Sequence, residues 1–96
     1  MEETPDKISA TRRENFNIRL EAVTPAGYRW QPVYDEAYVK LISDEVTPDS
    51  EKMGVGGIEQ FVFQSIKPGN TIIEMSYKRP WEKSASKHKK IFVEIK

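Results

Sequence analysis

Arg79-Pro80-Trp81 is the stretch of this sequence that points most directly to a chemical function, and that function is binding. It follows a strand-like run over 71–77 and precedes a lysine-rich segment. Pro80 lacks the N–H that a sheet ladder needs, so the strand should end there and leave an indole and a guanidinium in a loop. Trp and Arg are the residue types most enriched at binding hot spots. On this motif alone, two interpretations stay open: Trp81 caps the core, or it contacts a partner.

Catalytic and metal chemistry find little support in the composition. The chain has no cysteine, which excludes disulfides, thiolate catalysis and cysteine-based zinc sites. Its one histidine, His88, stands among lysines and is expected to be a solvated loop residue. No nucleophile–base pair or metal constellation is visible in the sequence. We therefore expect a protein that is not an enzyme and that binds neither a metal nor a cofactor.

Size and charge narrow the classes of partner. The chain has 96 residues, enough for one domain, and 38% apolar with 31% charged residues is typical of a globular protein. Fifteen basic residues balance fifteen acidic ones, so no overall field favours nucleic acid or a membrane, and no apolar run approaches the length that spans a bilayer. A weaker alternative, nucleic-acid binding, would use the lysine run, which we interpret instead as solubilising the last loop: Lys83, Lys87, Lys89 and Lys90.

Alternating polar and apolar residues predict strands through most of the chain. The clearest is 15–21, where Phe16, Ile18 and Leu20 share one face. Further strands are expected near 7–10 and at 28–34, 38–42, 58–66, 71–77 and 91–95. No segment has a convincing helical period with caps. The pattern predicts an all-β, immunoglobulin-like β-sandwich of about seven to eight short strands.

The same reading divides the chain into a tail and one domain. We expect a flexible amino-terminal tail over residues 1–6, a single immunoglobulin-like domain over 7–96, and within it a long loop over 43–57. The start of the chain is acidic and polar, unlike a signal peptide. A cytoplasmic location is the default expectation, and a secretory, lysosomal or periplasmic one is expected if a leader has been removed.

Strand order sorts the connections between the two ends of the sandwich. If every strand crosses once, three loops share one end: a first loop (Thr24-Pro25-Ala26-Gly27), a second loop (Gly54-Val55-Gly56-Gly57) and a third loop (Arg79-Pro80-Trp81). Plain turns at Asp35-Glu36 and Lys67-Pro68-Gly69-Asn70 share the other end. Antibody domains build a binding surface from three loops at one end of a rigid sandwich, so this arrangement predicts a recognition protein.

Each loop alone also has a plainer interpretation. The second loop could be a flexible hairpin loop or could approach a partner closely through its backbone, but no helix follows it to form a phosphate site. The first loop could be a structural turn or a small tip that enters a narrow cleft. Trp30 is expected in the core, where immunoglobulin-like sandwiches often bury a tryptophan, and Tyr28 is expected to support the loops.

Taken in order, the motifs are more specific than their parts. Gly27-Tyr28-Arg29-Trp30, the second loop followed by Phe61 and Phe63, and 77–82 together resemble the chagasin family of protein inhibitors of papain-like cysteine proteases. The likeness extends over about 16–95. The first loop departs from the family pattern Asn-Pro-Thr-Thr-Gly, whether it is aligned without a gap or with one residue deleted. In both alignments Ala26 replaces the usual threonine, so a hydroxyl contact is lost.

The resemblance implies a reversible, tight-binding inhibitor that wedges its three loops into the active-site cleft and is not cleaved. By position, the first loop would lie nearest the catalytic Cys–His pair, the second along the non-primed subsites, and the third over the primed side with Trp81 as anchor. The implied partner is a protease of the papain and cathepsin class, and we expect a monomer when free. The alternative is an immunoglobulin-like adhesion or interaction module with no protease target.

Overall fold

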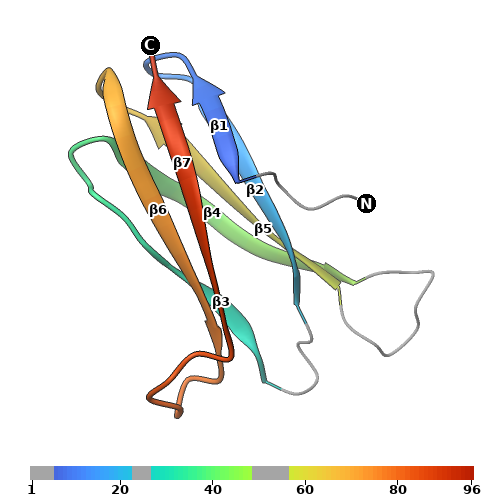
Figure 1. Cartoon of the computed structure of the whole chain (residues 1–96). Helices are drawn as coiled ribbons and strands as arrows, with labels where there is room; N and C mark the ends of the chain where they lie inside the picture. Colours follow the sequence, from blue (N-terminus) through green and yellow to red (C-terminus); the bar gives the residue numbers. More distant parts are fainter. Residues whose placement is uncertain (1–5, 23–26, 49–56) are drawn as a thin grey trace.

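The structure is built of two facing sheets, as Figure 1 shows. The computed structural model describes residues 6–22, 27–48 and 57–96. One sheet has the strand order β1-β7-β6-β3 and the other β2-β5-β4, and every pairing is antiparallel except that of β1 with β7. The described residues form seven strands: β1 (Lys7–Ala10), β2 (Asn15–Ala22), β3 (Arg29–Val33), β4 (Val39–Pro48), β5 (Gly57–Ser65), β6 (Gly69–Lys78) and β7 (Lys87–Ile95). The predicted all-β sandwich is confirmed.

The core fills the space between the sheets with every second side chain of each strand. The predicted inward face of β2 is buried, and its Phe16 and Ile18 lie opposite Phe63 and Phe61 of β5. Phe16 stacks on Phe63 with ring centroids 5.8 Å apart. The other sheet supplies the facing layer: Ile73, Met75, Tyr77, Ile91, Val93 and Ile95. Burial of these apolar side chains is the main force holding the two sheets together.

Three strands are longer than the sequence pattern predicted. β4 continues to Pro48, so the expected long loop over 43–57 is wrong over its first part. A shift in register between Leu41 and Ser43 interrupts the alternation of β4, which hides the rest of the strand from a pattern of period two. β6 starts at Gly69, before the predicted Thr71. β7 starts at Lys87, because its first, polar residues form backbone pairs with β6 although they do not alternate with apolar ones. His88 is therefore an exposed strand residue, not a loop residue.

Trp30 is buried as predicted and joins the two sheets. Its side chain is 6% exposed and packs in the core cluster. The indole N–H donates a hydrogen bond to the carbonyl of Glu21 on β2, at 2.8 Å. The backbone N–H donates to Oε1 of Glu59 on β5, also at 2.8 Å. Because β3 forms an edge of its sheet, these two bonds fix that edge to the opposite sheet.

The amino-terminal end of the described chain lies against β7. The expected tail falls outside the described residues except for Asp6. The Asp6 carbonyl accepts a hydrogen bond from the backbone N–H of Phe92 at 2.8 Å, and its carboxylate lies 3.5 Å from Nζ of Lys89. The described residues contain no helix that is long and apolar enough to cross a membrane.

Ser65 closes the end of the sandwich that carries the plain turns. Its buried hydroxyl lies within hydrogen-bond distance of the carbonyl oxygens of Thr11 and Glu14 and accepts the Glu14 N–H at 3.2 Å. The Ser65 carbonyl accepts the N–H of Arg13, a residue with a φ of 68°, at 2.8 Å. The backbone and the hydroxyl of Ser65 together therefore bond to the polar groups of the turn between β1 and β2.

Replacing Ser65 by alanine should destabilise the protein without changing the opposite end. The variant removes the hydroxyl that lies between the Thr11 and Glu14 carbonyl oxygens, although each of these keeps a backbone N–H donor. Loss of these hydrogen bonds should lower the free energy of unfolding by about 1 kcal/mol. Urea denaturation of Ser65→Ala and of Ser9→Ala, an exposed strand position, measures the difference. The control should change stability by less than about 0.5 kcal/mol. Equal losses in the two variants would contradict this role for Ser65.

A candidate binding site at one end of the sandwich

The strands that flank the three loops end on the same side of the molecule. Ala22 of β2 and Pro48 of β4 both pair with Gly57 of β5, which brings the bases of the first and second loops together. Arg29 of β3 pairs with Lys78 of β6, which places the third loop beside the first. Figure 1 shows these strand ends in its lower half. The strand ends therefore follow the alternation that strand order predicted.

The predicted site residues are described only in part. Gly27, Gly57, Arg79, Pro80 and Trp81 belong to the described part of the chain. Gly57 is the buried first residue of β5. The remaining predicted residues lie outside the described ones: Thr24, Pro25, Ala26, Gly54, Val55 and Gly56. The described geometry of the site is therefore that of the third loop and of the residues packed beneath it.

The third loop is a turn that its own polar groups hold in shape. Strand β6 stops at Lys78, as the proline predicted, and the N–H of Glu82 donates to the carbonyl of Arg79 at 3.0 Å. Pro80 occupies the second position of this turn, where its fixed φ is favourable. Oε1 of Glu82 accepts the Arg79 N–H at 3.0 Å, and Nζ of Lys78 donates to the Glu82 carbonyl at 3.1 Å. Sequence reasoning missed Glu82, although its spacing of three residues from Arg79 could have indicated it.

Arg79 lies on an aromatic stack that rises from the core. Trp30 and Tyr77 have ring centroids 4.8 Å apart, and Tyr77 stacks on Tyr28 at 5.0 Å. The Arg79 guanidinium lies 4.7 Å from the centre of the Tyr28 ring, and its Nη2 donates to the Tyr28 hydroxyl at 3.0 Å. Stacking and cation–π contacts of this kind are attractive, so the loop is attached to the core by a continuous series of rings.

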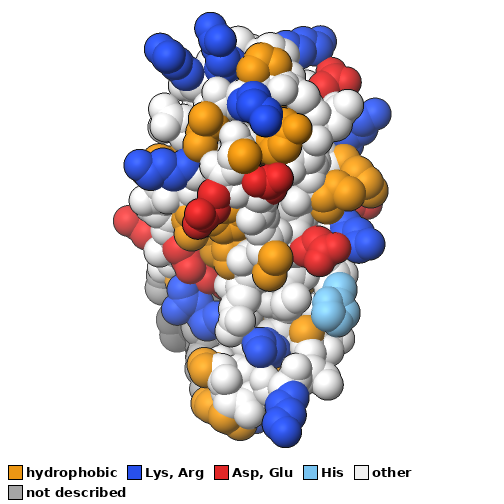
Figure 2. Space-filling view, turned by 90° about the vertical axis from the view of Figure 1, so that its left-hand side faces the viewer, with side chains coloured by type: hydrophobic (Ala, Val, Ile, Leu, Met, Phe, Trp, Pro, Cys, Tyr) orange, Lys and Arg blue, Asp and Glu red, His pale blue; other side chains and the backbone are white. Residues whose placement is uncertain are grey.

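Trp81 projects from this support into solvent. Its side chain is 71% exposed, so the interpretation in which it caps the core is wrong. The Arg79 guanidinium lies 5.7 Å from the centre of its ring. Figure 2 shows hydrophobic side chains gathered at the lower tip of the molecule, next to lysine or arginine side chains. A large exposed indole on a held turn has the character of a contact residue.

Gly27 is the point where the first loop touches the third. Its φ of 85° lies in the left-handed region that glycine adopts readily. A Cβ at this position would lie 3.2 Å from Cη2 of Trp81 and 3.6 Å from Cγ of Arg79. Both the backbone angle and the neighbouring side chains therefore favour glycine here.

A buried carboxyl lies at the base of the site. Glu59 is fully buried, and its Oε2 accepts a hydrogen bond from Nε of Arg29 at 3.0 Å while its Oε1 accepts the Trp30 N–H. The pKa of Glu59 is raised from its ordinary 4.5 to about 7, chiefly by burial. Asp44 contributes to this increase, whereas the hydrogen bond from the Trp30 N–H and the charge of Arg29 oppose it. A carboxyl so placed changes its charge near neutral pH.

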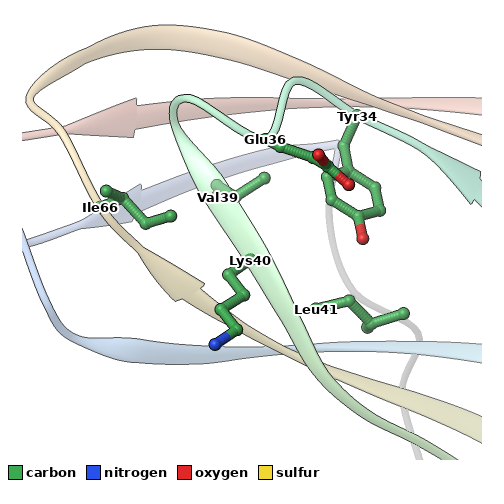
Figure 3. A pocket seen from close by; sticks show the side chains of 6 residues that line it. All are labelled: Tyr34, Glu36, Val39, Lys40, Leu41 and Ile66. Carbon is green, nitrogen blue, oxygen red and sulfur yellow. The ribbon is translucent and has the colours of Figure 1, made fainter.

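Two hollows lie on the surface of the described residues, one toward the opposite end and one that reaches the base of this site. The first, of about 390 Å³, lies toward the end with the plain turns and is shown in Figure 3. Its lining is largely apolar, with one acid and one lysine: Tyr34, Glu36, Val39, Lys40, Leu41 and Ile66. The second, of about 470 Å³, lies beside β7 and has a mixed charged lining: Asp6, Glu21, Trp30, Lys87, His88 and Lys89. The described residues contain no group of three or more side chains suited to hold a metal ion.

Comparison with known proteins identifies the family of the chain. Residues 9–95 match the family described as Chagasin family peptidase inhibitor I42. The chain belongs to the chagasin family. It is therefore a peptidase inhibitor and not an enzyme, and chagasin-family membership removes the alternative of an adhesion module.

One relative by sequence and two solved structures are similar to this chain. Amoebiasin-2 of Entamoeba histolytica is 31% identical over 87 residues, which cover 83% of this chain and 71% of that protein. The crystal structure of the cysteine protease inhibitor EhICP2 from the same organism covers 97% of this chain and 100% of its own, with 20% identity and a TM-score of 0.76. The solution structure of Amebosin covers 94% and 88%, with 23% identity and a TM-score of 0.62. Both solved structures share the fold described above.

Replacing Gly27 by alanine should strain the backbone and move the indole of Trp81. A left-handed φ costs about 1–2 kcal/mol for a residue with a Cβ, so the free energy of unfolding should fall by about that amount. The NMR resonance of the Trp81 indole N–H, assigned with Trp81→Phe, should also shift because the new methyl group meets the ring.

Gly69→Ala is the matched control for this variant. Gly69 has a φ of 142° at the opposite end, where a Cβ would lie 2.8 Å from Cε1 of Tyr38. The control should destabilise the protein but leave the Trp81 resonance in place. An unshifted Trp81 resonance in Gly27→Ala would rule out the contact between the two loops.

Proposed function

We propose that this protein is a reversible, tight-binding inhibitor of cysteine proteases of the papain and cathepsin class. Membership of a peptidase-inhibitor family supports inhibition, and the description of EhICP2 as a cysteine protease inhibitor supports the class of target. The observation that carries the proposal is Trp81, whose indole is 71% exposed at the end of the sandwich where three loops emerge.

In this proposal the three loops close the active-site cleft together and are not cleaved. The first loop lies nearest the catalytic Cys–His pair, and the second runs along the non-primed subsites through backbone hydrogen bonds. The third covers the primed side, where Trp81 packs on the enzyme and Arg79 and Pro80 flank it. The contact of Gly27 with Trp81 supports joint presentation of the first and third loops.

Rigid presentation explains how short loops could bind tightly. A standard inhibitor interface buries about 1,600 Å² in total, and its affinity depends on how little ordering the loops require. The hydrogen bonds of Glu82 and the stacking of Arg79 on Tyr28 order the third loop before any partner arrives. In this proposal the free inhibitor is a monomer and one molecule blocks one protease.

Titration of papain or a cathepsin-type enzyme with the purified protein tests the function. Inhibition should be complete at one inhibitor per active site, should reverse on dilution, and should leave the inhibitor chain intact by mass spectrometry. The absence of inhibition at micromolar concentration across several papain-like enzymes would falsify the proposal.

Replacing Trp81 by alanine should weaken inhibition with little effect on stability. Loss of a central tryptophan at such interfaces costs about 2–4 kcal/mol, so the Kd should rise by about thirty- to a thousandfold. The melting temperature should stay nearly constant because the side chain is exposed. Phe92→Ala, which removes an aromatic that is 49% exposed on β7, should leave the Kd unchanged. A Trp81→Ala inhibitor as tight as the parent would remove Trp81 from the contact.

A further inference from the structure

Arg79 belongs to the predicted binding motif, but its guanidinium makes its contacts within the molecule. Two of the three guanidinium nitrogens have partners: Nη2 donates to the Tyr28 hydroxyl at 3.0 Å, and Nε donates to Oε1 of Glu82 at 3.4 Å. We propose that Arg79 is a positioning residue, which holds the indole of Trp81 in place and contributes to inhibition through that indole rather than through its own contact with the protease. The proposal rests on the inhibitory function proposed above.

The Arg79 head group is fixed in both position and orientation. Its guanidinium carbon lies 4.7 Å from the centre of the Tyr28 ring, and the hydroxyl of the same residue accepts Nη2. Because a guanidinium is planar and its N–H groups point in fixed directions, the Tyr28 hydroxyl and the Glu82 carboxylate together set its plane. The same Glu82 oxygen also accepts the Arg79 backbone N–H at 3.0 Å. Arg79 is therefore held at its backbone and at the end of its side chain.

Arg79 in turn holds Trp81. The guanidinium carbon lies 5.7 Å from the centre of the Trp81 ring, inside the range of about 6 Å over which a cation attracts an aromatic face. In the described part of the chain no aromatic ring stacks on this indole, and Arg79 is the one cation within that range. The Arg79 stem and the indole also lie against the same residue, Gly27. The position of this exposed side chain therefore depends on Arg79.

Ordering the indole in the free inhibitor favours binding. A side chain that must be immobilised when the complex forms reduces affinity by about two- to tenfold. A positioning role and a direct contact then make different predictions. If Arg79 acts by positioning, its replacement matters only while Trp81 is present. If Arg79 contacts the protease directly, its replacement weakens inhibition whether Trp81 is present or not.

A double-mutant cycle on one papain-class enzyme tests this difference. The Ki is measured for the parent protein, Arg79→Ala, Trp81→Ala and the double variant. Arg79→Ala should raise the Ki by about two- to tenfold in the parent protein and by less than about twofold in the Trp81→Ala background. An equal rise in the two backgrounds would overturn the proposal, because it would assign Arg79 a contact of its own with the enzyme.

Arg79→Lys separates the geometry of the side chain from its charge. Lysine keeps the positive charge but lacks the planar fork that reaches the Tyr28 hydroxyl and Glu82 together. Its Ki should therefore rise as much as that of Arg79→Ala, and a lysine variant as tight as the parent would contradict the positioning role. Arg12→Ala is the matched control, since Arg12 is an exposed arginine in the turn between β1 and β2 at the opposite end. It should leave the Ki unchanged.

A measurement on the free inhibitor separates this proposal from the function on which it rests. The heteronuclear NOE of the Trp81 indole N–H, which reports picosecond to nanosecond motion, should fall in Arg79→Ala and Arg79→Lys and stay constant in Arg12→Ala. If Arg79→Ala does not fold, Tyr28→Phe serves in its place, because it removes the acceptor of Nη2 and keeps the ring.

The two proposals fail in different ways. Failure to inhibit any papain-class enzyme would overturn the proposed function, and the indole measurement would still decide whether Arg79 positions Trp81. An unchanged NOE of the Trp81 indole in the folded Arg79 variants would overturn the positioning role even if inhibition is strong.

Discussion

The attachment of one edge strand is the constraint on which the binding end depends. β3 belongs to one sheet, but both N–H groups of its Trp30 donate to the other sheet, to the Glu59 carboxyl and to the Glu21 carbonyl. Because β3 starts directly after the first loop, these two bonds decide where that loop leaves the sandwich. Burial of the Trp30 side chain stabilises the packing of β3 on the core. The hydrogen bonds, which depend on direction, fix the orientation of the strand.

The third loop is built on the same residue. Trp30 contacts Tyr77, and Tyr77 stacks on Tyr28. Arg79 lies over the Tyr28 ring, so these packed rings connect the third loop to the core. The Arg79 guanidinium is satisfied by the Tyr28 hydroxyl and by Glu82. Trp81 can therefore be exposed and still have a defined position, which is the property that a pre-formed contact residue requires.

The sequence predicted the strands whose residues alternate regularly. It missed features that depend on contacts between residues distant in the chain. Phe16 and Ile18 predicted β2 because one face of that strand is buried. The bulge at Leu41 broke the same pattern in β4, and the strand was missed beyond it. Pro80 predicted a loop, but only the packing of residues distant in sequence showed that Trp81 is exposed. For the same reason the burial and partners of Glu59 were not foreseen.

A buried carboxyl beneath the site follows from the edge position of β3. An apolar side chain at Glu59 would avoid the cost of burying an acid, but it would leave the Trp30 N–H without an acceptor, at a cost of about 1–3 kcal/mol. The Glu59 carboxyl accepts hydrogen bonds from that N–H and from Nε of Arg29 at the same time. The side chains of serine and asparagine are shorter and would not reach these donors from β5. Sensitivity to pH near neutrality is then a consequence of closing this edge, because the acceptor that reaches it is one that can ionise.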